Sequence, residues 1–188
     1  MHFFALVIAI MWLGLWIYWI LSAFSAKRNT ISNMRQFILS RTGIIILALT
    51  LIYLFNRLPL SIKNLFPVDN SIILAVAFIG FLFGFLLTIG ARIQLGKNWG
   101  MPMTEKHDPT LVTTGPYKYI RHPIYTGFLI MSLCSAIDVN YYWMIVFIVA
   151  VIFFTFSAEV EEKMMMKKFP KAYPSYRAKT KMFLSFII

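Results

Sequence analysis

The sequence has few of the side chains that build disulfide-linked or metal-binding proteins. It contains one cysteine, Cys134, and three histidines in 188 residues. A single cysteine excludes a disulfide within the chain, and its apolar surroundings predict a buried, inert thiol. With so few ligating side chains, the sequence does not predict a metal site. The chain also lacks a G-x-G-x-x-G motif after a strand, so it does not predict the nucleotide-binding fold of many soluble enzymes.

Charged residues are also scarce, at 13%, whereas 60% of the residues are hydrophobic and 17% are aromatic. This apolar share exceeds that of an average soluble domain and is typical of an integral membrane protein. Only 7 residues are acidic against 18 basic ones, which gives a formal charge of +11. Because the basic residues lie between apolar runs, they indicate membrane topology and contact with membrane lipids, and no nucleic-acid partner is predicted.

Five apolar segments predict an all-α helical bundle with about five transmembrane helices. The segments are 3–24, 43–55 extended back to Phe37, 71–91, 124–137 and 141–157. Only three residues separate the last two, so they are expected to form an antiparallel helical hairpin, followed by a C-terminal cytoplasmic helix. Gly80, Gly84 and Gly90 form a ridge of small residues that favours close approach of a neighbouring helix. Residues 1–188 are thus expected to form a single membrane-embedded domain.

The distribution of lysine and arginine predicts how these spans are oriented. With the N-terminus outside, 16 of the 18 basic residues fall in the inner loops and the tail, against Arg57 and Lys63 outside. Because basic residues favour the cytoplasmic side, this count predicts a multi-pass protein with a cytoplasmic C-terminus. The polar stretch 92–122 and the tail would then lie on the same face of the membrane.

The stretch TGPYKYIRHPIYTG, residues 114–127, combines helix-start and turn signals. Pro123 disfavours helical geometry at His122 but suits the first turn of a following helix. Arg121 and His122 therefore mark a helix entrance, which attracts anions such as a carboxylate. Gly115 is expected in a turn, and Tyr125 about one turn into the helix. Taken singly, these residues equally fit a basic anchor, an interfacial histidine and an aromatic belt.

The tail contains AEVEEKMMMKKFPKAYPSYRAK, residues 158–179. Glu159 and Glu162 are three residues apart and are expected on one face of a helix that reaches water. A ribose hydroxyl or an amino group is a suitable partner for such acids. The alternative is an ordinary solvated helix whose methionines lie against the headgroups.

Together, LVTTGPYKYIRHPIYTG, the later EE and KFPKAYPSYRAK resemble the isoprenylcysteine carboxyl methyltransferase family and its prokaryotic relatives. The resemblance covers roughly residues 92–188, about half the chain. It implies that this half is catalytic, that it binds S-adenosyl-L-methionine from the cytosol, and that a lipophilic substrate enters from the bilayer. Residues 1–91 would hold three N-terminal spans, of which the first two match only in hydrophobicity.

The resemblance also implies a set of site residues. The cofactor pocket would be formed by Val112, Gly115, Pro116, Tyr117, Tyr119, His122 and Tyr125, and closed by Glu159, Glu162, Tyr173 and Tyr176. Gln94, at the inner end of the third span, is added from its position. Arg121 and Glu162 are the predicted catalytic residues. A carboxylate acceptor is already ionised at neutral pH and needs no base, so Arg121 is expected to hold it through its guanidinium fork.

Other functions remain open on the sequence alone. A membrane reductase of the sterol type would use NADPH, whose 2'-phosphate Lys97, Lys106 and Lys118 are placed to bind. A methyltransferase acting on a phospholipid or another amine, and a non-enzymatic membrane scaffold, are further alternatives. Lipid-facing grooves have similar compositions whatever they bind, so the sequence does not identify the acceptor.

Overall fold

A computed structural model describes residues 3–23, 29–30, 34–59, 68–100, 103–106, 110–140 and 142–183. Within them lie the helices α1 (Phe3–Ala23), α2 (Met34–Asn56), α4 (Ser71–Leu95), α5 (Pro123–Asp138), α6 (Tyr142–Lys168) and α7 (Ala172–Lys179). Two 3-10 helices, η1 (Gly96–Asn98) and η2 (Gly115–Lys118), lie between α4 and α5. The predicted helical architecture is confirmed in outline, with one addition. The short strands β1 (Asn29–Thr30) and β2 (Glu105–Lys106) pair antiparallel.

Three of the helical segments are long and apolar enough to cross a membrane, namely Phe3–Ser22, Ser71–Asn98 and Tyr142–Lys168. Two shorter apolar helical segments, Arg41–Leu54 and Pro123–Asp138, accompany them in the described part of the chain. Each contains or overlaps one of the five apolar segments predicted from the sequence. The lengths and composition of these helices are those of a multi-pass membrane protein. Lys27, Arg28 and Lys63, which enter the predicted orientation, lie outside the described residues.

Helix α6 is longer than the apolar segment that predicts it. The segment ends at Ser157, but the helix continues to Lys168, because no proline or glycine interrupts it. From the end of the apolar run onward, the helix packs against other parts of the protein, since Ser157, Ala158 and Glu162 are buried. Pro170 follows closely after the helix end, as the restriction on residues before proline predicts. The last span and the start of the acidic tail are therefore one rigid element.

Helices α4 and α5 cross closely at glycines. A Cβ added at Gly84 would lie 2.8 Å from the Gly127 carbonyl oxygen, and one at Gly80 would lie 2.9 Å from Cys134 Sγ. This confirms two members of the predicted small-residue ridge. Gly90 differs, because nothing lies within 4 Å of the Cβ position there. The predicted ridge therefore ends at Gly84, and close approach of the backbones is confined to the middle of α4.

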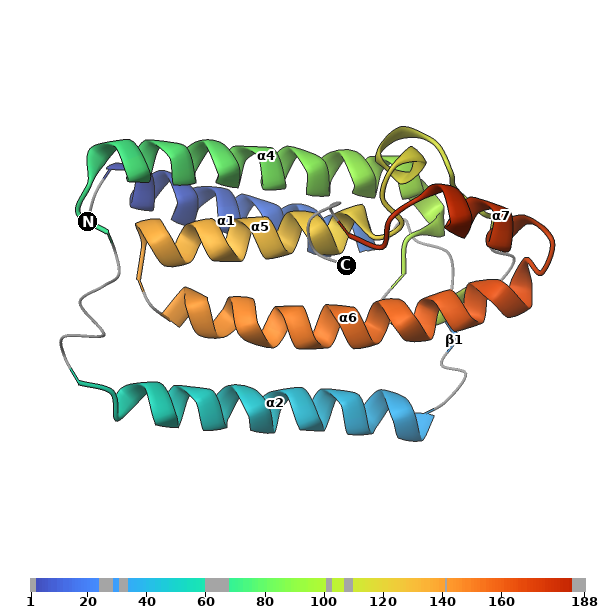
Figure 1. The fold of residues 1–188 in the computed structure, drawn as a ribbon, viewed down its shortest axis with the longest axis horizontal. Helices are drawn as coiled ribbons and strands as arrows, with labels where there is room; N and C mark the ends of the chain where they lie inside the picture. Colours follow the sequence, from blue (N-terminus) through green and yellow to red (C-terminus); the bar gives the residue numbers. More distant parts are fainter. Residues whose placement is uncertain are drawn as a thin grey trace.

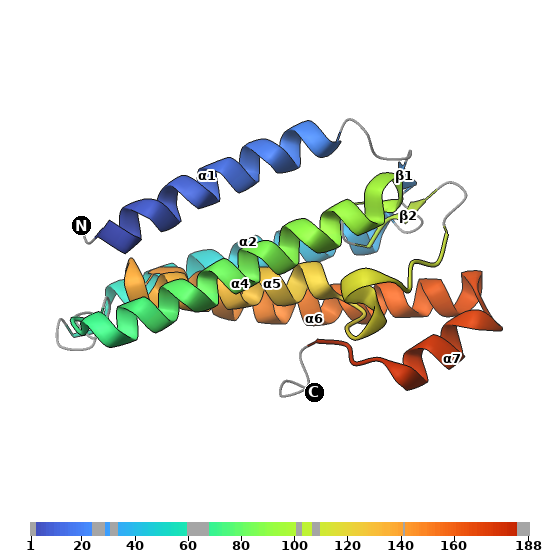
Figure 2. The same cartoon turned by 90° about the horizontal axis from the view of Figure 1, so that it is seen from above.

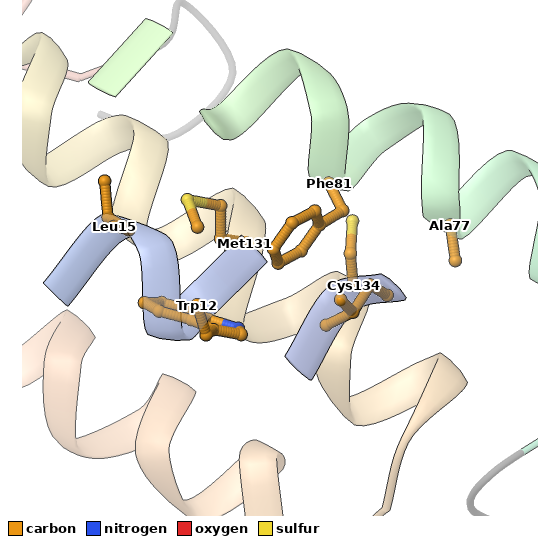
Figure 3. Packing of buried hydrophobic residues seen from close by; sticks show 7 residues of the cluster. Trp12, Leu15, Ala77, Phe81, Met131 and Cys134 are labelled. Atoms are coloured by element: carbon orange, nitrogen blue, oxygen red, sulfur yellow. The ribbon is translucent and has the colours of Figure 1, made fainter. Parts of the chain in front are cut away.

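The apolar core lies where α1, α4 and α5 meet (Figure 3). Phe81 from α4 and Met131 from α5 are fully buried, and Trp12 from α1 packs its ring against Phe81 at 6.0 Å. Cys134 is a free thiol in this cluster, as predicted. Figure 1 shows α6 lying between α5 and α2, and α6 contacts both. In Figure 2, seen from above, α1 is tilted away from α4. The bundle thus has a packed side, at α4 and α5, and a looser side toward α2.

Arg92, in the last turn of α4, links the end of α1 to α4. Its side chain donates to the carbonyl oxygens of Ser22 at 2.7 Å and Gly96 at 2.9 Å. Its guanidinium also lies over the Trp99 ring, 4.7 Å from the centroid. Carbonyls at a helix C-terminus carry partial negative charge, so they are suitable partners for a residue that is only 2% exposed. This contact fixes the position of Trp99 and the nearby Trp19 at one end of the bundle.

Candidate functional site

The polar elements of the chain gather at one end of the bundle, where α7, η2, the start of α5 and the end of α6 meet (Figure 1). Local sequence explains how the chain turns there. Gly115 has a φ of +60°, which glycine adopts without strain, and Pro116 follows it in the first turn of η2. His122 has a non-helical backbone and Pro123 is the first residue of α5, as predicted. These turns place Tyr117, Arg121 and His122 beside the end of α6.

The tail returns to cover this segment through backbone hydrogen bonds. The Arg121 N–H donates to the Lys181 carbonyl oxygen at 2.8 Å, and the Lys181 N–H donates to the Tyr119 carbonyl oxygen at 3.1 Å. Tyr176 Oη donates to the Tyr117 carbonyl oxygen at 2.7 Å. Residues more than fifty positions apart are thereby joined, so the tail forms a wall of the site.

Glu162 lies at the centre of an ion-pair cluster. Its Oε1 accepts from Arg121 Nε at 2.6 Å, and its Oε2 lies 3.0 Å from Arg177 Nε. His122 Nε2 is 3.5 Å from Oε1. The side chains of Arg121 and Glu162 are only 8% and 5% exposed. Arg121 Nη1 also donates to the carbonyl oxygens of Arg177 and Thr180, so the cluster joins the segment just before α5 to α6 and the tail.

The neighbouring residue, Glu161, points to a different set of partners. Its Oε1 accepts from Tyr125 Oη at 2.5 Å and from the Met103 N–H at 3.1 Å. The Tyr125 ring is stacked between His122, at 5.4 Å, and Phe154, at 4.4 Å. His122 Nδ1 lies 3.6 Å from Glu161 Oε2. His122 thus lies between two carboxylates, and Tyr125 is fixed both by its ring and by its hydroxyl.

A cavity of about 980 Å³ opens from this end and continues along the bundle. Its polar end is lined by Tyr117, Arg121, His122, Tyr125, Glu161, Tyr173 and Tyr176. Its apolar arm is lined by α1, α2 and α6, with Trp12, Trp16, Ile44, Ala48, Ile52, Trp143, Val146, Val149, Ala150 and Phe153. All five tryptophans of the sequence line it, Trp19 and Trp99 included. The cavity therefore joins a polar chamber to a long apolar arm.

The tyrosines of the polar chamber stay neutral at physiological pH. Burial raises the pKa of Tyr176 to about 12, and it raises the pKa of Tyr173 still further. Burial, reinforced by the nearby Glu161, raises the pKa of Tyr117 well above its usual value. Removal from water disfavours the phenolate in each case. These residues therefore offer aromatic faces and hydroxyl groups, and they do not act as bases.

The structure brings together seven of the predicted site residues. Val112, Tyr117, Arg121, His122, Tyr125, Tyr173 and Tyr176 all line the cavity. Glu162 is buried behind them and reaches the cavity through Arg121 and His122. Gln94 Nε2 donates to Thr114 Oγ1 at 2.6 Å and its side chain lies against Gly115. Neither Gln94 nor Gly115, Pro116, Tyr119 or Glu159 is among the residues that line the cavity, and Tyr119 and Glu159 are exposed.

Sequence reasoning missed Glu161 as a site residue. The i, i+3 spacing predicts Glu159 and Glu162 as the pair of site residues. In the structure the pair is Glu161, which lines the cavity, and Glu162, which binds Arg121. The adjacent EE pair was the available signal. Of the lysines proposed for a reductase, Lys97 and Lys118 do not line the cavity, and the lysines in its described lining are Lys167 and Lys168. Trp12 and Trp16, in the first apolar segment, also contribute to the cavity wall.

Fold and site together define a class of protein: a helical membrane protein whose large cavity is polar at one end of the bundle and apolar along it. Residues 75–167 match the model of the isoprenylcysteine carboxyl methyltransferase (ICMT) family. This match confirms the family resemblance predicted from the motifs. It includes most of α4, all of α5 and nearly all of α6, with Glu161 and Glu162.

A relative in Schizosaccharomyces pombe is named protein-S-isoprenylcysteine O-methyltransferase. It is 32% identical to this chain over 106 residues. The aligned part is 54% of this chain and 45% of the yeast protein. The chain therefore spans about half the length of that relative.

Proposed function

We propose that this protein is a membrane methyltransferase that methylates the carboxylate of a lipophilic, isoprenylcysteine-like acceptor with S-adenosyl-L-methionine. The observation that carries the proposal is that one cavity contains both a polar aromatic chamber and an apolar arm continuous with it. A volume of about 980 Å³ is at the upper end of the range for small-molecule sites, which fits two reactants better than one. The family match supports the same reaction class.

The polar chamber fits a cationic sulfur donor. Tyr117, Tyr173 and Tyr176 line the chamber with aromatic rings, whose faces attract cations. Glu161 is the one carboxylate in the described lining of the cavity. S-adenosyl-L-methionine supplies a methyl group on a sulfonium, which an ionised carboxylate oxygen accepts by in-line displacement. The protein's part is to align the reactants and exclude water, which contributes on the order of 7–11 kcal/mol in well-oriented reactions.

Arg121 is proposed to hold the carboxylate of the acceptor. It lines the cavity, while its Nε and Nη1 are held by Glu162 and by carbonyl oxygens of the tail. Its Nη2 has no hydrogen bond to the described residues and remains to donate to a ligand. Glu162 acts through Arg121 and His122, because it does not line the cavity, and is a positioning residue in this proposal.

The acceptor is proposed to enter sideways from the bilayer. Three residues of the cavity wall, Trp16, Ile52 and Val146, are between 39% and 51% exposed on the apolar surface of the bundle. A wall that is open at membrane depth admits a lipid chain without exposing it to water. In the same proposal five helices span the membrane, α5 and α6 as an antiparallel hairpin. The N-terminus is then outside, with the chamber on the cytoplasmic side.

The reaction is tested in membranes that contain the protein, with radiolabelled S-adenosyl-L-methionine and S-farnesyl-N-acetylcysteine. Label should pass to the acceptor as a base-labile methyl ester. His122→Ala should lose most of this transfer, because it removes the ring stacked on Tyr125 and a partner of Glu162. Calorimetry in detergent should show heat with S-adenosylhomocysteine and none with NADPH. Binding of NADPH alone would instead support a reductase.

The charge of Glu161 should distinguish the donor from its product. Glu161→Gln keeps the shape of the side chain and an acceptor for Tyr125 and Met103, but it removes the negative charge. We expect the affinity for S-adenosyl-L-methionine to fall about fivefold more than that for neutral-sulfur S-adenosylhomocysteine, since only the former loses an opposite charge. Isothermal titration of both ligands measures the ratio. Glu159→Gln, an exposed residue on the same helix, is the control and should leave the ratio unchanged; equal losses for both ligands would contradict this role of Glu161.

A further inference from the structure

The apolar arm of the cavity ends at a pair of stacked tryptophans. Trp12 from α1 and Trp143 from the first turn of α6 lie 4.8 Å apart, with their ring planes 20° from parallel. Both line the cavity, as does Tyr142 beside them. Because α6 begins at Tyr142, Tyr142 and Trp143 stand at the end of α6 opposite to Glu161, and the Trp12 ring reaches Trp143 from the middle of α1. The stack therefore forms the far end of the arm.

This end is held rigidly from several sides. Trp12 is 7% exposed, and its Nε1 donates to Ser135 Oγ on α5 at 3.0 Å. Tyr142 Oη donates to Asn56 Oδ1, at the end of α2, at 3.0 Å. The far end thus ties α6 to α1, α2 and α5. A flexible side chain such as methionine would yield to a longer ligand, whereas a stacked and hydrogen-bonded tryptophan resists displacement.

The lining of the arm follows the axes of α2 and α6. On α6 its lining residues include Trp143, Val146 and Ala150, spaced three or four positions apart on one helix face. On α2 they are Ile44, Ala48 and Ile52, spaced by four. Trp143 and Phe154 are eleven residues apart on α6, about 16 Å along the axis at 1.5 Å per residue. Such an arm accepts one extended chain lying parallel to the helices.

We propose that the Trp12–Trp143 stack is a specificity-determining element that limits the length of the acceptor's chain. The chain lies along α6 with its carboxylate at Arg121 and its far end against the two indole rings. Acceptors that reach the stack bury their whole chain, and longer ones must fold back or leave the carboxylate out of place. This inference rests on the proposed function and adds to it a limit on the length of the acceptor's chain.

Removing one ring should lengthen the arm. Methyl transfer is measured with geranyl, farnesyl and geranylgeranyl thioethers of N-acetylcysteine. In Trp143→Ala, the ratio of kcat/KM for the longest acceptor to that for the shortest should rise about tenfold or more. The reason is that the extra carbons of the longer chain can bind in the space left by the indole ring. Ala150→Leu, which fills the middle of the arm, should lower the same ratio. Trp99→Ala, an equal truncation of the cavity wall beside Tyr117, is the matched control and should change all acceptors by a similar factor.

A second measurement needs neither turnover nor a variant. A farnesylcysteine analogue with a diazirine at the end of its chain is bound to the wild-type protein, irradiated, and mapped by mass spectrometry. Labelling should fall on peptides that contain Trp12, Trp143 or Tyr142. Labelling centred on Tyr117 or Glu161, or an unchanged length ratio in Trp143→Ala, would overturn the inference. A wild-type protein that labels at the stack but methylates none of the acceptors would instead refute the proposed function alone.

Discussion

Replacing Glu162 with alanine is expected to lower the free energy of unfolding by about 3–5 kcal/mol, because it leaves Arg121 buried without its charged partner. Arg121 is only 8% exposed and pairs with Glu162 at 2.6 Å. The carboxylate also holds Arg177, so the tail should loosen with it. Thermal unfolding in detergent micelles, followed by circular dichroism, should show a midpoint lowered by roughly 10 °C.

Glu159→Ala provides the control for this substitution. This substitution removes the same carboxylate group from the same helix. Because Glu159 is exposed, its loss should change the midpoint of thermal unfolding little. Equal effects of the two substitutions would show that the cluster around Glu162 does not stabilise the fold. The affinity for S-adenosylhomocysteine should fall in Glu162→Ala as well, since Arg121 and the tail lose their common support.

The second large effect is expected at the crossing of α4 and α5. In Gly127→Ala the new methyl group would lie 2.6 Å from the Gly84 carbonyl oxygen and would overlap Thr88 Oγ1. Because Gly84 contributes backbone, no side-chain rotation relieves the overlap and the helices must separate. Overpacking of this kind costs about 3 kcal/mol. The same thermal unfolding measurement should therefore show a lowered midpoint, with the helical content of the remaining folded protein unchanged.

Gly90→Ala is the matched control, because it adds the same methyl group to α4 where nothing lies within 4 Å. It should leave the midpoint unchanged or raise it slightly, since alanine favours helix over glycine. A comparable loss in both variants would point to glycine flexibility and not to close packing as the reason for these residues.

Much of the fold could be predicted because hydrophobicity dictates helices in a membrane protein. The segment predicted over 71–91 became α4, and the proline rule located the start of α5 at Pro123. Hydropathy alone predicts α6 only as far as Ser157, and the helix continues beyond this apolar run to Lys168. Spacing alone placed Gly90 in the ridge, although nothing lies within 4 Å of the Cβ position there.

The candidate site was predictable in its motifs and less so in its side chains. The turn and helix-start signals around Gly115 and His122 are local, so they follow from the sequence. Which glutamate lines the cavity depends on how α6 is rotated against Tyr125, and no local signal fixes that rotation. The contribution of α1 and α2 to the cavity is a tertiary feature, which hydrophobicity does not distinguish from exposure to lipid.

The presence of every tryptophan in the wall of one cavity has a spectroscopic consequence. Indole emission depends on the polarity around the ring, and here the five emitters surround the same space. The intrinsic fluorescence of the protein is therefore a report on what fills that space, with Trp99 near the polar chamber and Trp12 and Trp143 at the other extreme. Binding of either reactant can therefore be followed by tryptophan fluorescence, without an attached dye.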